Sequence, residues 1–183
     1  MKLLGISGSL RKGSYNTALL EIAGTLMPKG VAWTLAGCAD IPLYNKDLDT
    51  ENKPEEVLQF LQAIRYADGV LFATPEYNYS FSGVLKNAID WASRPAYKSV
   101  LAGKPVAIVS ASQSLIGGAR AQDHLRQVLS ATLSPVLPSP PFLVPMVQDK
   151  IDGNGLLTDE DTRRRLARYI IDFVAWVNRL AGR

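Results

Sequence analysis

Short apolar runs alternate with segments of helical period along the chain, and this alternation limits the possible folds more than any other feature. The runs are continuously apolar, which is typical of parallel strands covered by helices on both faces of a sheet. The last run is rich in proline and is interpreted as an edge strand with an irregular entry. The predicted strands are Leu3–Ser7, Val31–Ala36, Gly69–Thr74, Pro105–Ser112 and Pro135–Val144.

Five helices are predicted between and after these strands, because apolar residues recur there at the spacing of one helix face. Pro54 suits the first turn of the second helix. Thr158 is the predicted N-cap of the last helix, and the acidic residues 159–161 suit the positive end of its dipole. The apolar faces consist of Leu19, Leu20, Ala23, Leu26 and Met27; Val57, Leu58, Leu61 and Ile64; Val84, Leu85, Ala88, Ile89 and Ala92; Ala121, Leu125, Val128, Leu129 and Thr132; and Leu166, Ile170, Phe173, Val174 and Val177.

Strands that alternate with helices predict an α/β fold, an open doubly wound sheet of five parallel strands with helices on both faces. A chain of 183 residues suits one domain, which we expect to span residues 1–183. Crossover helices place the loops that follow the strands along one edge of the sheet, where ligands bind in this fold class. The loops after Ser7, Thr74 and Ser112 are therefore expected to form the site.

Composition excludes several classes of protein. The net charge of +3 comes without a dense basic stripe that contains aromatic residues, so no nucleic-acid partner is expected. No segment approaches the ~20 apolar residues of a membrane span, and the apolar run at the N-terminus is too short for a signal peptide. Cys38 is the only cysteine, so no internal disulfide can form. We expect a cytoplasmic protein in which Cys38 is a buried apolar residue and not a nucleophile.

The loop after the first strand, residues 8–17, has the character of a phosphate site. It leads into a helix N-terminus, where free N–H groups and the helix dipole attract anions. Its spacing is neither G-x-x-x-x-G-K-[ST] nor G-x-G-x-x-G, and its hydroxyl, amide and arginine donors suit a terminal monophosphate such as that of FMN. The alternative is a polar turn in which Asn16 only caps the helix. The candidate cofactor-binding residues of this loop are Ser9, Arg11, Ser14, Tyr15 and Asn16.

The loop after the third strand exposes aromatic residues where a planar ring could lie. Pro75 stiffens its entry, so that nearby N–H groups keep one direction. N–H dipoles that face the N1/C2 side of a flavin stabilise the negative charge that appears on reduction, and Tyr77 can lie against such a ring. Alternatively, the aromatic residues of this region cover a subunit interface, with Tyr79, Phe81 and Trp91 as candidates.

Four motifs stand out when these loops are taken together. They are Gly8-Ser9-Leu10-Arg11 followed by Ser14 and Asn16; Pro75-Glu76-Tyr77-Asn78; Gly83 with Leu85-Lys86-Asn87-Ala88-Ile89-Asp90-Trp91; and Gly117-Gly118-Ala119-Arg120. The set resembles the NADPH-dependent FMN reductase family, and most closely its branch of bacterial quinone and chromate reductases. The resemblance runs from about Met1 to Gln127, and it implies a flavodoxin-like domain with FMN as cofactor and NADPH or NADH as electron donor.

The resemblance also implies roles for individual residues. Ser9, Arg11, Ser14 and Asn16 take the place of the residues that hold the FMN phosphate. The ring residues by resemblance are Pro75, Glu76, Tyr77 and Asn78, with Ser112 and Gly117 beside the ring or the ribityl chain. Members of the family are homodimers or homotetramers. Asp123 stands where close relatives often place a tyrosine of the tetramer contact, a departure that bears on the tetramer and not on the flavin site.

The mechanism that the resemblance implies is a ping-pong exchange. NAD(P)H gives a hydride to N5 of the flavin and leaves, and a small acceptor takes its place: a quinone, chromate, an azo or nitro compound, or flavin. No catalytic side chain and no metal are predicted, because the cofactor carries the chemistry. His124, the only histidine, is expected to be a partly exposed helix residue.

Three other functions share parts of this pattern. A flavodoxin-type electron carrier binds FMN without being an enzyme, but such carriers dock through an acidic rim and this chain is net positive. A receiver-type signalling domain needs an acidic cluster at the first strand end, and residues 6–9 offer none. A sugar- or nucleotide-phosphate enzyme could use the same phosphate loop, but it would be colourless.

Overall fold

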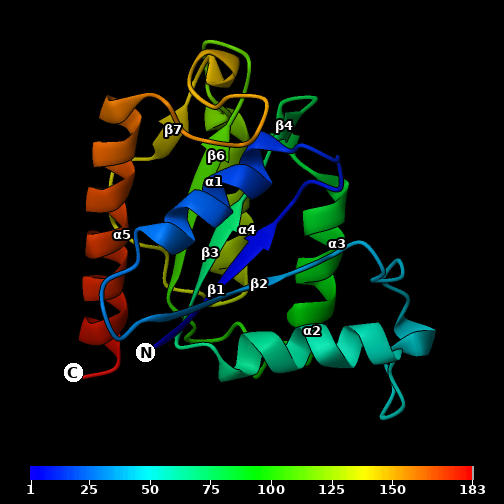
Figure 1. Ribbon diagram of the computed structural model, residues 1–183. Helices are drawn as coiled ribbons and strands as arrows, with labels where there is room; N and C mark the ends of the chain where they lie inside the picture. Colours follow the sequence, from blue (N-terminus) through cyan, green and yellow to red (C-terminus); the bar gives the residue numbers. More distant parts are fainter. Residues whose placement is uncertain (183) are drawn as a thin grey trace.

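Five parallel strands form one sheet in the order β2-β1-β3-β6-β7, and helices lie on both of its faces (Figure 1). The structure is a computed structural model that describes residues 1–182, and it confirms the α/β flavodoxin-like fold. The elements are β1 Lys2–Ser7, α1 Tyr15–Thr25, β2 Ala32–Ala36, α2 Glu55–Tyr66, β3 Gly69–Ala73, β4 Glu76–Tyr77, β5 Ser80–Phe81, α3 Gly83–Ala92, β6 Val106–Ala111, α4 Ala119–Ala131, β7 Phe142–Val144 and α5 Glu160–Leu180, with short 3₁₀ turns at Lys46–Leu48 and Val147–Asp149.

The strand order reverses direction at β1. This strand pairs in parallel with β2 on one side, where Leu3 lies opposite Trp33, and with β3 on the other, where Leu3 lies opposite Gly69. The connections that leave β1 and β3 therefore run in opposite directions and open a crevice at the carboxyl end of the sheet. The order β2-β1-β3-β6-β7 places the loops after β1 and β3 on either side of this crevice.

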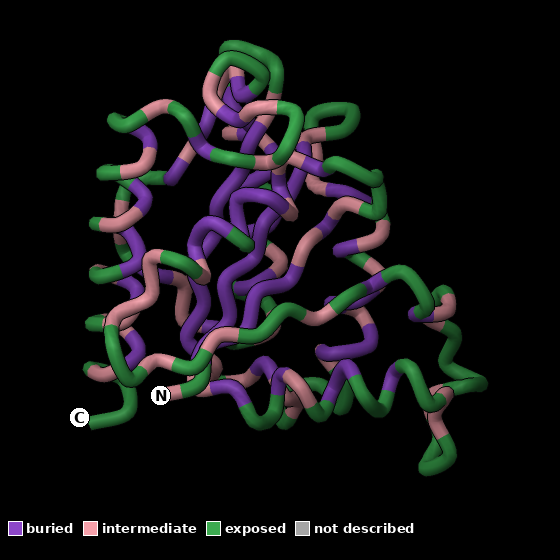
Figure 2. The backbone as a smooth tube through the Cα atoms, viewed as in Figure 1, coloured by how far each residue is buried: buried purple, intermediate pink, exposed green. Residues whose placement is uncertain are grey.

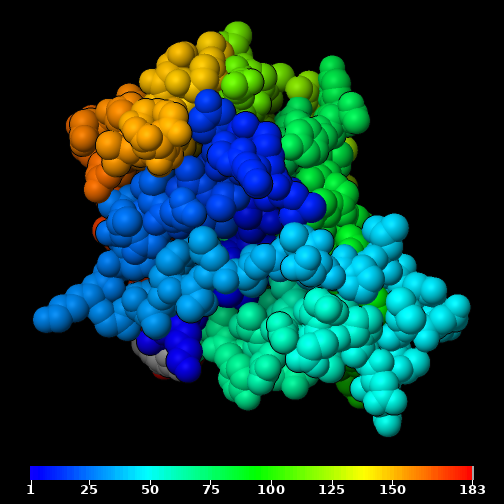
Figure 3. Space-filling view, turned by 45° about the vertical axis from the view of Figure 1, so that its right-hand side comes forward, coloured from blue at the N-terminus to red at the C-terminus, as the bar shows by residue number. Residues whose placement is uncertain are grey.

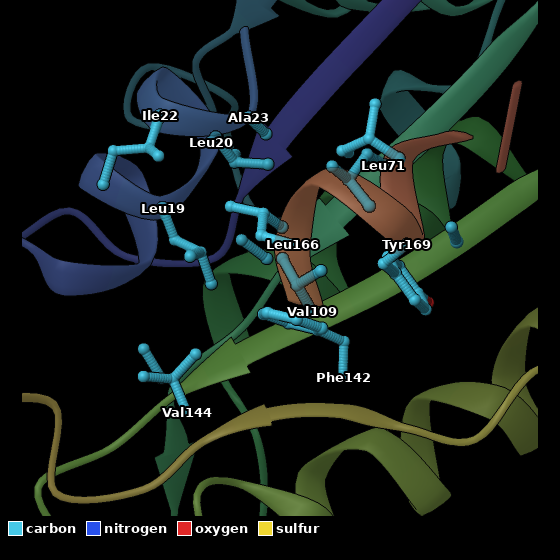
Figure 4. Packing of buried hydrophobic residues seen from close by; sticks show 14 of the residues in the cluster. Leu19, Leu20, Ile22, Ala23, Leu71, Val109, Phe142, Val144, Leu166 and Tyr169 are labelled. Atoms are coloured by element: carbon cyan, nitrogen blue, oxygen red, sulfur yellow. The ribbon is translucent and has the colours of Figure 1, made fainter. Parts of the chain in front are cut away.

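Two apolar cores lie on opposite faces of the sheet, because successive residues of a strand point to opposite faces. On one face, Leu3 and Leu71 pack with α1 and α5; Figure 4 shows this cluster around Leu166 and Tyr169. On the other face, Leu4 and Ile6 pack with α2, α3 and α4. The central strands are buried along their length, whereas the outer sides of the helices are exposed (Figure 2).

Two of the predicted strands differ from those in the structure. Strand β2 lies where Val31–Ala36 was predicted, but as an edge strand it is mostly exposed and not buried on both faces. The predicted strand Pro135–Val144 shrinks to β7 at Phe142–Val144, with one separate bridge between Val136 and Val106. Proline lacks the N–H group that a ladder needs, so the proline-rich stretch cannot pair continuously with β6.

Several predicted helix details are also corrected. Pro54 is the N-cap of α2 and not a first-turn residue. Asp159, not Thr158, caps α5, because its carboxylate accepts the N–H of Thr162 at 2.8 Å. Leu58 is 41% exposed and so lies off the buried face of α2.

Trp91, an interface candidate from the sequence, is fully buried in the structure. Its indole N–H donates to the carbonyl of Pro42 at 2.8 Å, and its ring meets that of Tyr44 edge-on. The side chain therefore anchors the segment after β2 to α3, so its assignment to a subunit contact is wrong.

The shortness of β7 leaves part of β6 without a strand partner, and Tyr169 of α5 takes that place. Its hydroxyl donates to the carbonyl of Ile108 at 2.8 Å and lies 3.3 Å from the N–H of the same residue. Burial raises the pKa of Tyr169 above its ordinary value, so the hydroxyl keeps its proton. One side chain thus satisfies both backbone groups at the gap in the ladder.

Replacing this hydroxyl should destabilise the fold. Tyr169→Phe leaves the N–H and the carbonyl of Ile108 buried without a partner, so we expect the free energy of unfolding to fall by about 1–3 kcal/mol. Urea denaturation followed by circular dichroism measures this loss. The matched control Tyr66→Phe removes a hydroxyl from a side chain that is 65% exposed, and it should change stability by less than about 0.5 kcal/mol. Equal stability of the two variants would show that the bonds to Ile108 contribute nothing.

Candidate cofactor site

Three loops meet at the carboxyl edge of the sheet and enclose a cavity of about 370 Å³, within the roughly 300–1,000 Å³ usual for small-molecule sites. In the space-filling view the blue N-terminal part of the chain meets the green segments of the later loops toward the upper edge of the molecule (Figure 3). The cavity brings together all the predicted site residues except Asn78 and Gly117. Its lining consists of Ser9, Arg11, Ser14, Tyr15, Asn16, Pro75, Glu76, Tyr77, Ala111, Ser112 and Gln113.

One end of the cavity has the donors that an anion requires. Ser14 is the N-cap of α1, and its hydroxyl accepts the N–H of Thr17 at 3.3 Å. The N–H groups of Tyr15 and Asn16, in the first turn, have no acceptor within the helix and face the preceding loop. Arg11 is exposed, with its guanidinium 5.4 Å from the centre of the Tyr15 ring, and it supplies the full positive charge of this end.

Asn16 has a structural partner that the sequence did not reveal. Its side-chain amide is buried, donates to the carbonyl of Ala111 at 3.0 Å and accepts the N–H of Ala111 at 2.9 Å. Both ends of the amide are thus used to join α1 to the end of β6, and only the backbone N–H of Asn16 is left for an anion. The alternative in which Asn16 caps the helix is wrong, since Ser14 holds that position.

The loop after β3 is a short β-hairpin. Strands β4 and β5 pair antiparallel, and Asn78 and Tyr79 form the turn with φ values of 49° and 67°. Two consecutive positive φ angles are those of a type I′ turn, in which asparagine is favoured. Asn78 is therefore exposed at the tip and does not line the cavity. The sequence indicated only a loop here, because strands of two residues are too short to show an alternating pattern.

Glu76 lines the cavity, but its carboxylate is already paired. Its side chain is only 8% exposed and lies 2.6 Å from Nε and 2.5 Å from Nη2 of Arg120. Pro75 beside it is buried, and its carbonyl accepts the hydroxyl of Thr74 at 2.9 Å. What this wall offers to a ligand is therefore rigid backbone and the ring of Tyr77, and not an unpaired carboxylate.

The loop after β6 contributes Ser112 but not Gly117. The hydroxyl of Ser112 accepts the N–H of Ser114 at 3.1 Å, which folds the start of the loop. Gly117 has φ +65°, and a Cβ there would lie 3.0 Å from the backbone nitrogen of Pro145. The glycine is thus required by the packing of the loop against the segment after β7. Sequence reasoning attributed this requirement to a ligand.

Neither Cys38 nor His124 belongs to the lining of this cavity. Cys38 is buried, and burial raises its pKa to about 12, so the thiol is not a nucleophile at neutral pH. His124 is exposed on α4, with Nδ1 3.1 Å from the hydroxyl of Ser80. No group of histidine, cysteine or acidic residues suited to a metal ion occurs among residues 1–182.

A larger cavity of about 620 Å³ lies at the opposite, amino-terminal edge of the sheet. The ammonium group of Lys104 there donates to the carbonyl groups of Arg65 and Ala67 at the end of α2. Burial lowers the pKa of Lys104. Its cation therefore stabilises the C-terminus of a helix, and the cavity is distant from the strand ends where ligands bind in this class of fold.

The pair between Asn16 and Ala111 leads to a prediction for the protein without cofactor. Asn16→Ala leaves two buried backbone groups of Ala111 unpaired, so the free energy of unfolding should fall by about 2–4 kcal/mol. Chemical denaturation of the apoprotein measures the effect. Asn154→Ala, at an exposed position, is the control and should be close to neutral. If both variants unfold at the same denaturant concentration, the two hydrogen bonds do not stabilise the fold.

Known proteins align with this chain over nearly its whole length. Residues 1–149 match the family described as NADPH-dependent FMN reductase. A protein named NAD(P)H-dependent FMN reductase from Pseudomonas aeruginosa is 48% identical over 182 residues, which cover 100% of this chain and 98% of that protein. A quinone reductase from Escherichia coli is 40% identical over 183 residues, covering 98% and 97%. Among solved structures, the flavoenzyme NAD(P)H:(acceptor) oxidoreductase FerB from Paracoccus denitrificans has a TM-score of 0.89 at 35% identity and 97% coverage of both chains. The chain belongs to the NADPH-dependent FMN reductase family.

Proposed function

We propose that this chain is an FMN-containing oxidoreductase that takes electrons from NADPH or NADH and reduces quinones or similar small acceptors, among them chromate, azo and nitro compounds and flavin. The observation that carries the proposal is that the loop after β1 and the loop after β3 line one cavity, at the crevice between these two strands. An anion-binding helix start and a rigid wall of backbone and aromatic ring line the same cavity. Family membership and the names of its relatives agree with this assignment.

The residues of the cavity fit FMN in charge and in shape. The first turn of α1, the hydroxyls of Ser9 and Ser14 and the cation of Arg11 match a terminal phosphate dianion. Pro75 and Tyr77 on one side, with Ser112 on the other, leave a space between loops that suits a flat ring. Bound there, FMN would supply the two-electron chemistry that the side chains of this chain cannot supply.

The protein's own part is to bind and orient. Glu76, the one carboxylate in the cavity lining, is held by Arg120, so the cavity presents no unpaired acid or base beside the ring. Tyr77 is 53% exposed at the mouth of the cavity, where a donor and an acceptor can come in turn. We infer from this open mouth that the nicotinamide and the acceptor use one place successively.

We further propose that residues 1–183 form one FMN-binding domain and that the protein acts in the cytoplasm as a homodimer or homotetramer. None of the helices described between residues 1 and 182 is long and apolar enough to cross a membrane. Large apolar side chains are exposed around the mouth of the site, as expected of surfaces that meet another subunit. They are Tyr77, Tyr79, Leu115 and Ile116.

The spectrum of the purified protein tests the function directly. We expect flavin absorbance in the visible, bleaching when NADPH or NADH is added without oxygen, and recovery of colour when benzoquinone is added. Steady-state rates should give parallel double-reciprocal lines. A protein that binds FMN but is not bleached by either nucleotide would be an electron carrier of the flavodoxin type. Intersecting lines would contradict the shared place for donor and acceptor.

The phosphate assignment has its own prediction. The double variant Ser9→Ala with Arg11→Ala removes a cation and a hydroxyl from the anion site, so the dissociation constant of FMN should rise at least about 30-fold, or about 2 kcal/mol. Fluorescence titration of the apoprotein with FMN measures it, and circular dichroism shows whether the fold is kept. Lys12→Ala is the matched control, because Lys12 is an exposed cation of the same loop outside the cavity lining. An unchanged affinity in the double variant would exclude this loop as the phosphate site.

A further inference from the structure

The wall of the cavity formed by the β4–β5 hairpin cannot be stable by itself. Each of its strands has two residues, and an isolated two-stranded hairpin is at best marginally stable in water. The turn also places Tyr79 at φ +67°, a region that bulky side chains avoid. Contacts from elsewhere in the molecule must hold the hairpin where Glu76 and Tyr77 line the cavity.

Helix α4 supplies these contacts, and Arg120 in its first turn makes the strongest of them. The guanidinium binds the carboxylate of Glu76 through Nε and Nη2, at 2.6 and 2.5 Å. The same group lies 3.8 Å from the centre of the Tyr79 ring, within the range of a cation–π contact. The N–H of Ala121 lies 3.4 Å from the second carboxylate oxygen, and His124 approaches Ser80. Arg120 therefore holds both the first strand of the hairpin and its turn.

The ion pair between Arg120 and Glu76 also determines the net charge of the cavity wall. The side chain of Glu76 is 8% exposed, whereas that of Arg120 is 37% exposed. The guanidinium of Arg120, with Nη2 2.5 Å from a carboxylate oxygen of Glu76, is the cation that compensates this carboxylate. Without Arg120 the wall would carry an uncompensated negative charge, and without Glu76 it would carry an uncompensated positive charge. Charges of opposite sign beside a redox ring shift its reduction in opposite directions.

We propose that Arg120 is a positioning residue of the redox site, which fixes the hairpin wall and neutralises Glu76 so that the ring can gain negative charge on reduction. The proposal rests on the proposed function. Arg120 lies outside the cavity lining. Under this proposal it nevertheless affects the ratio between the dissociation constants of reduced and oxidised FMN. Because the wild-type pair is neutral, each single variant exposes one charge.

The two single variants have opposite expected effects. In Arg120→Ala the unpaired Glu76 repels the reduced ring, so the dissociation constant of reduced FMN should rise about tenfold more than that of oxidised FMN. For a two-electron couple this is a shift of ~30 mV to lower potential. In Glu76→Gln the cation of Arg120 remains, so the potential should shift to a higher value. The double variant Arg120→Ala with Glu76→Gln should return toward the wild-type potential, because neither charge is left.

The experiment titrates each apoprotein with FMN in the oxidised state and under dithionite, and measures the midpoint potential of each loaded protein. Limited chymotrypsin digestion of the apoproteins reports the hairpin, which contains Tyr77 and Tyr79, and cleavage there should be faster in Arg120→Ala and in the double variant. Lys86→Ala is the matched control, because it breaks an exposed pair with Asp90 at 2.8 Å and should change neither reading. Arg120→Lys keeps the charge but not the two-point contact, so it should keep the potential while loosening the hairpin.

The signs decide the outcome. Opposite shifts in the two single variants, cancelled in the double variant, support the proposal. Shifts of the same sign, or none, would show that the pair acts only on structure and would overturn it. If Arg120→Ala does not fold, Glu76→Gln and Arg120→Lys still carry the test through the potential. A wild-type protein that binds no FMN would instead defeat the proposed function, which keeps the two failures apart.

Discussion

The parallel pairing of β1 with both β2 and β3 is the constraint on which the rest of the molecule depends. Right-handed crossovers from a strand with neighbours on both sides send α1 and α2 to opposite faces of the sheet. No helix then covers the edge between β1 and β3, and the loops after these strands approach each other. The N–H of Gly8 donates to the carbonyl of Ala73 at 2.8 Å, and a Cβ on Gly8 would lie 2.8 Å from the hydroxyl of Ser82. The absence of a side chain at Gly8 thus allows the loop after β1 to approach Ser82, the N-cap of α3 that directly follows the hairpin.

Apolar packing places the loops at the edge, but polar pairs fix their relative positions. Asn16 joins the start of α1 to the backbone of Ala111 at the end of β6. Arg120, which follows the loop after β6, joins that loop to Glu76 in the hairpin. The loop after β1 and the hairpin after β3 are thus each connected by polar contacts to the region of the loop after β6. A cavity between three separately mobile loops would lose entropy on binding a ligand, whereas tied loops have lost it on folding.

Whether the sequence could predict a feature of this arrangement depends on how far apart along the chain the interacting residues lie. Strands β1, β3 and β6 were correctly predicted because a strand covered on both faces has a continuous apolar run. Asn16 and Glu76 were predicted as site residues and line the cavity, but their partners lie 95 and 44 positions away in the sequence. Local patterns contain no information about such pairs. The hairpin was missed because its strands are too short for a period, and the exposure of β2 follows from its place at the edge, which only the tertiary structure defines.

The ion pair between Glu76 and Arg120 also makes the two ends of the cavity different in charge. At the anion end Arg11 is exposed and its charge is available to a ligand, whereas at the ring end the charge of Glu76 is cancelled by Arg120. The net charge of the lining is therefore concentrated where a phosphate would be held, and the ring end offers backbone dipoles and an aromatic face. A neutral planar acceptor needs no ion pair to enter such a region, and no unpaired carboxylate or ammonium in the lining selects one such acceptor over another. Under the proposed function, the entry of a neutral planar acceptor and the gain of charge by a redox ring would both be favoured by this neutralisation.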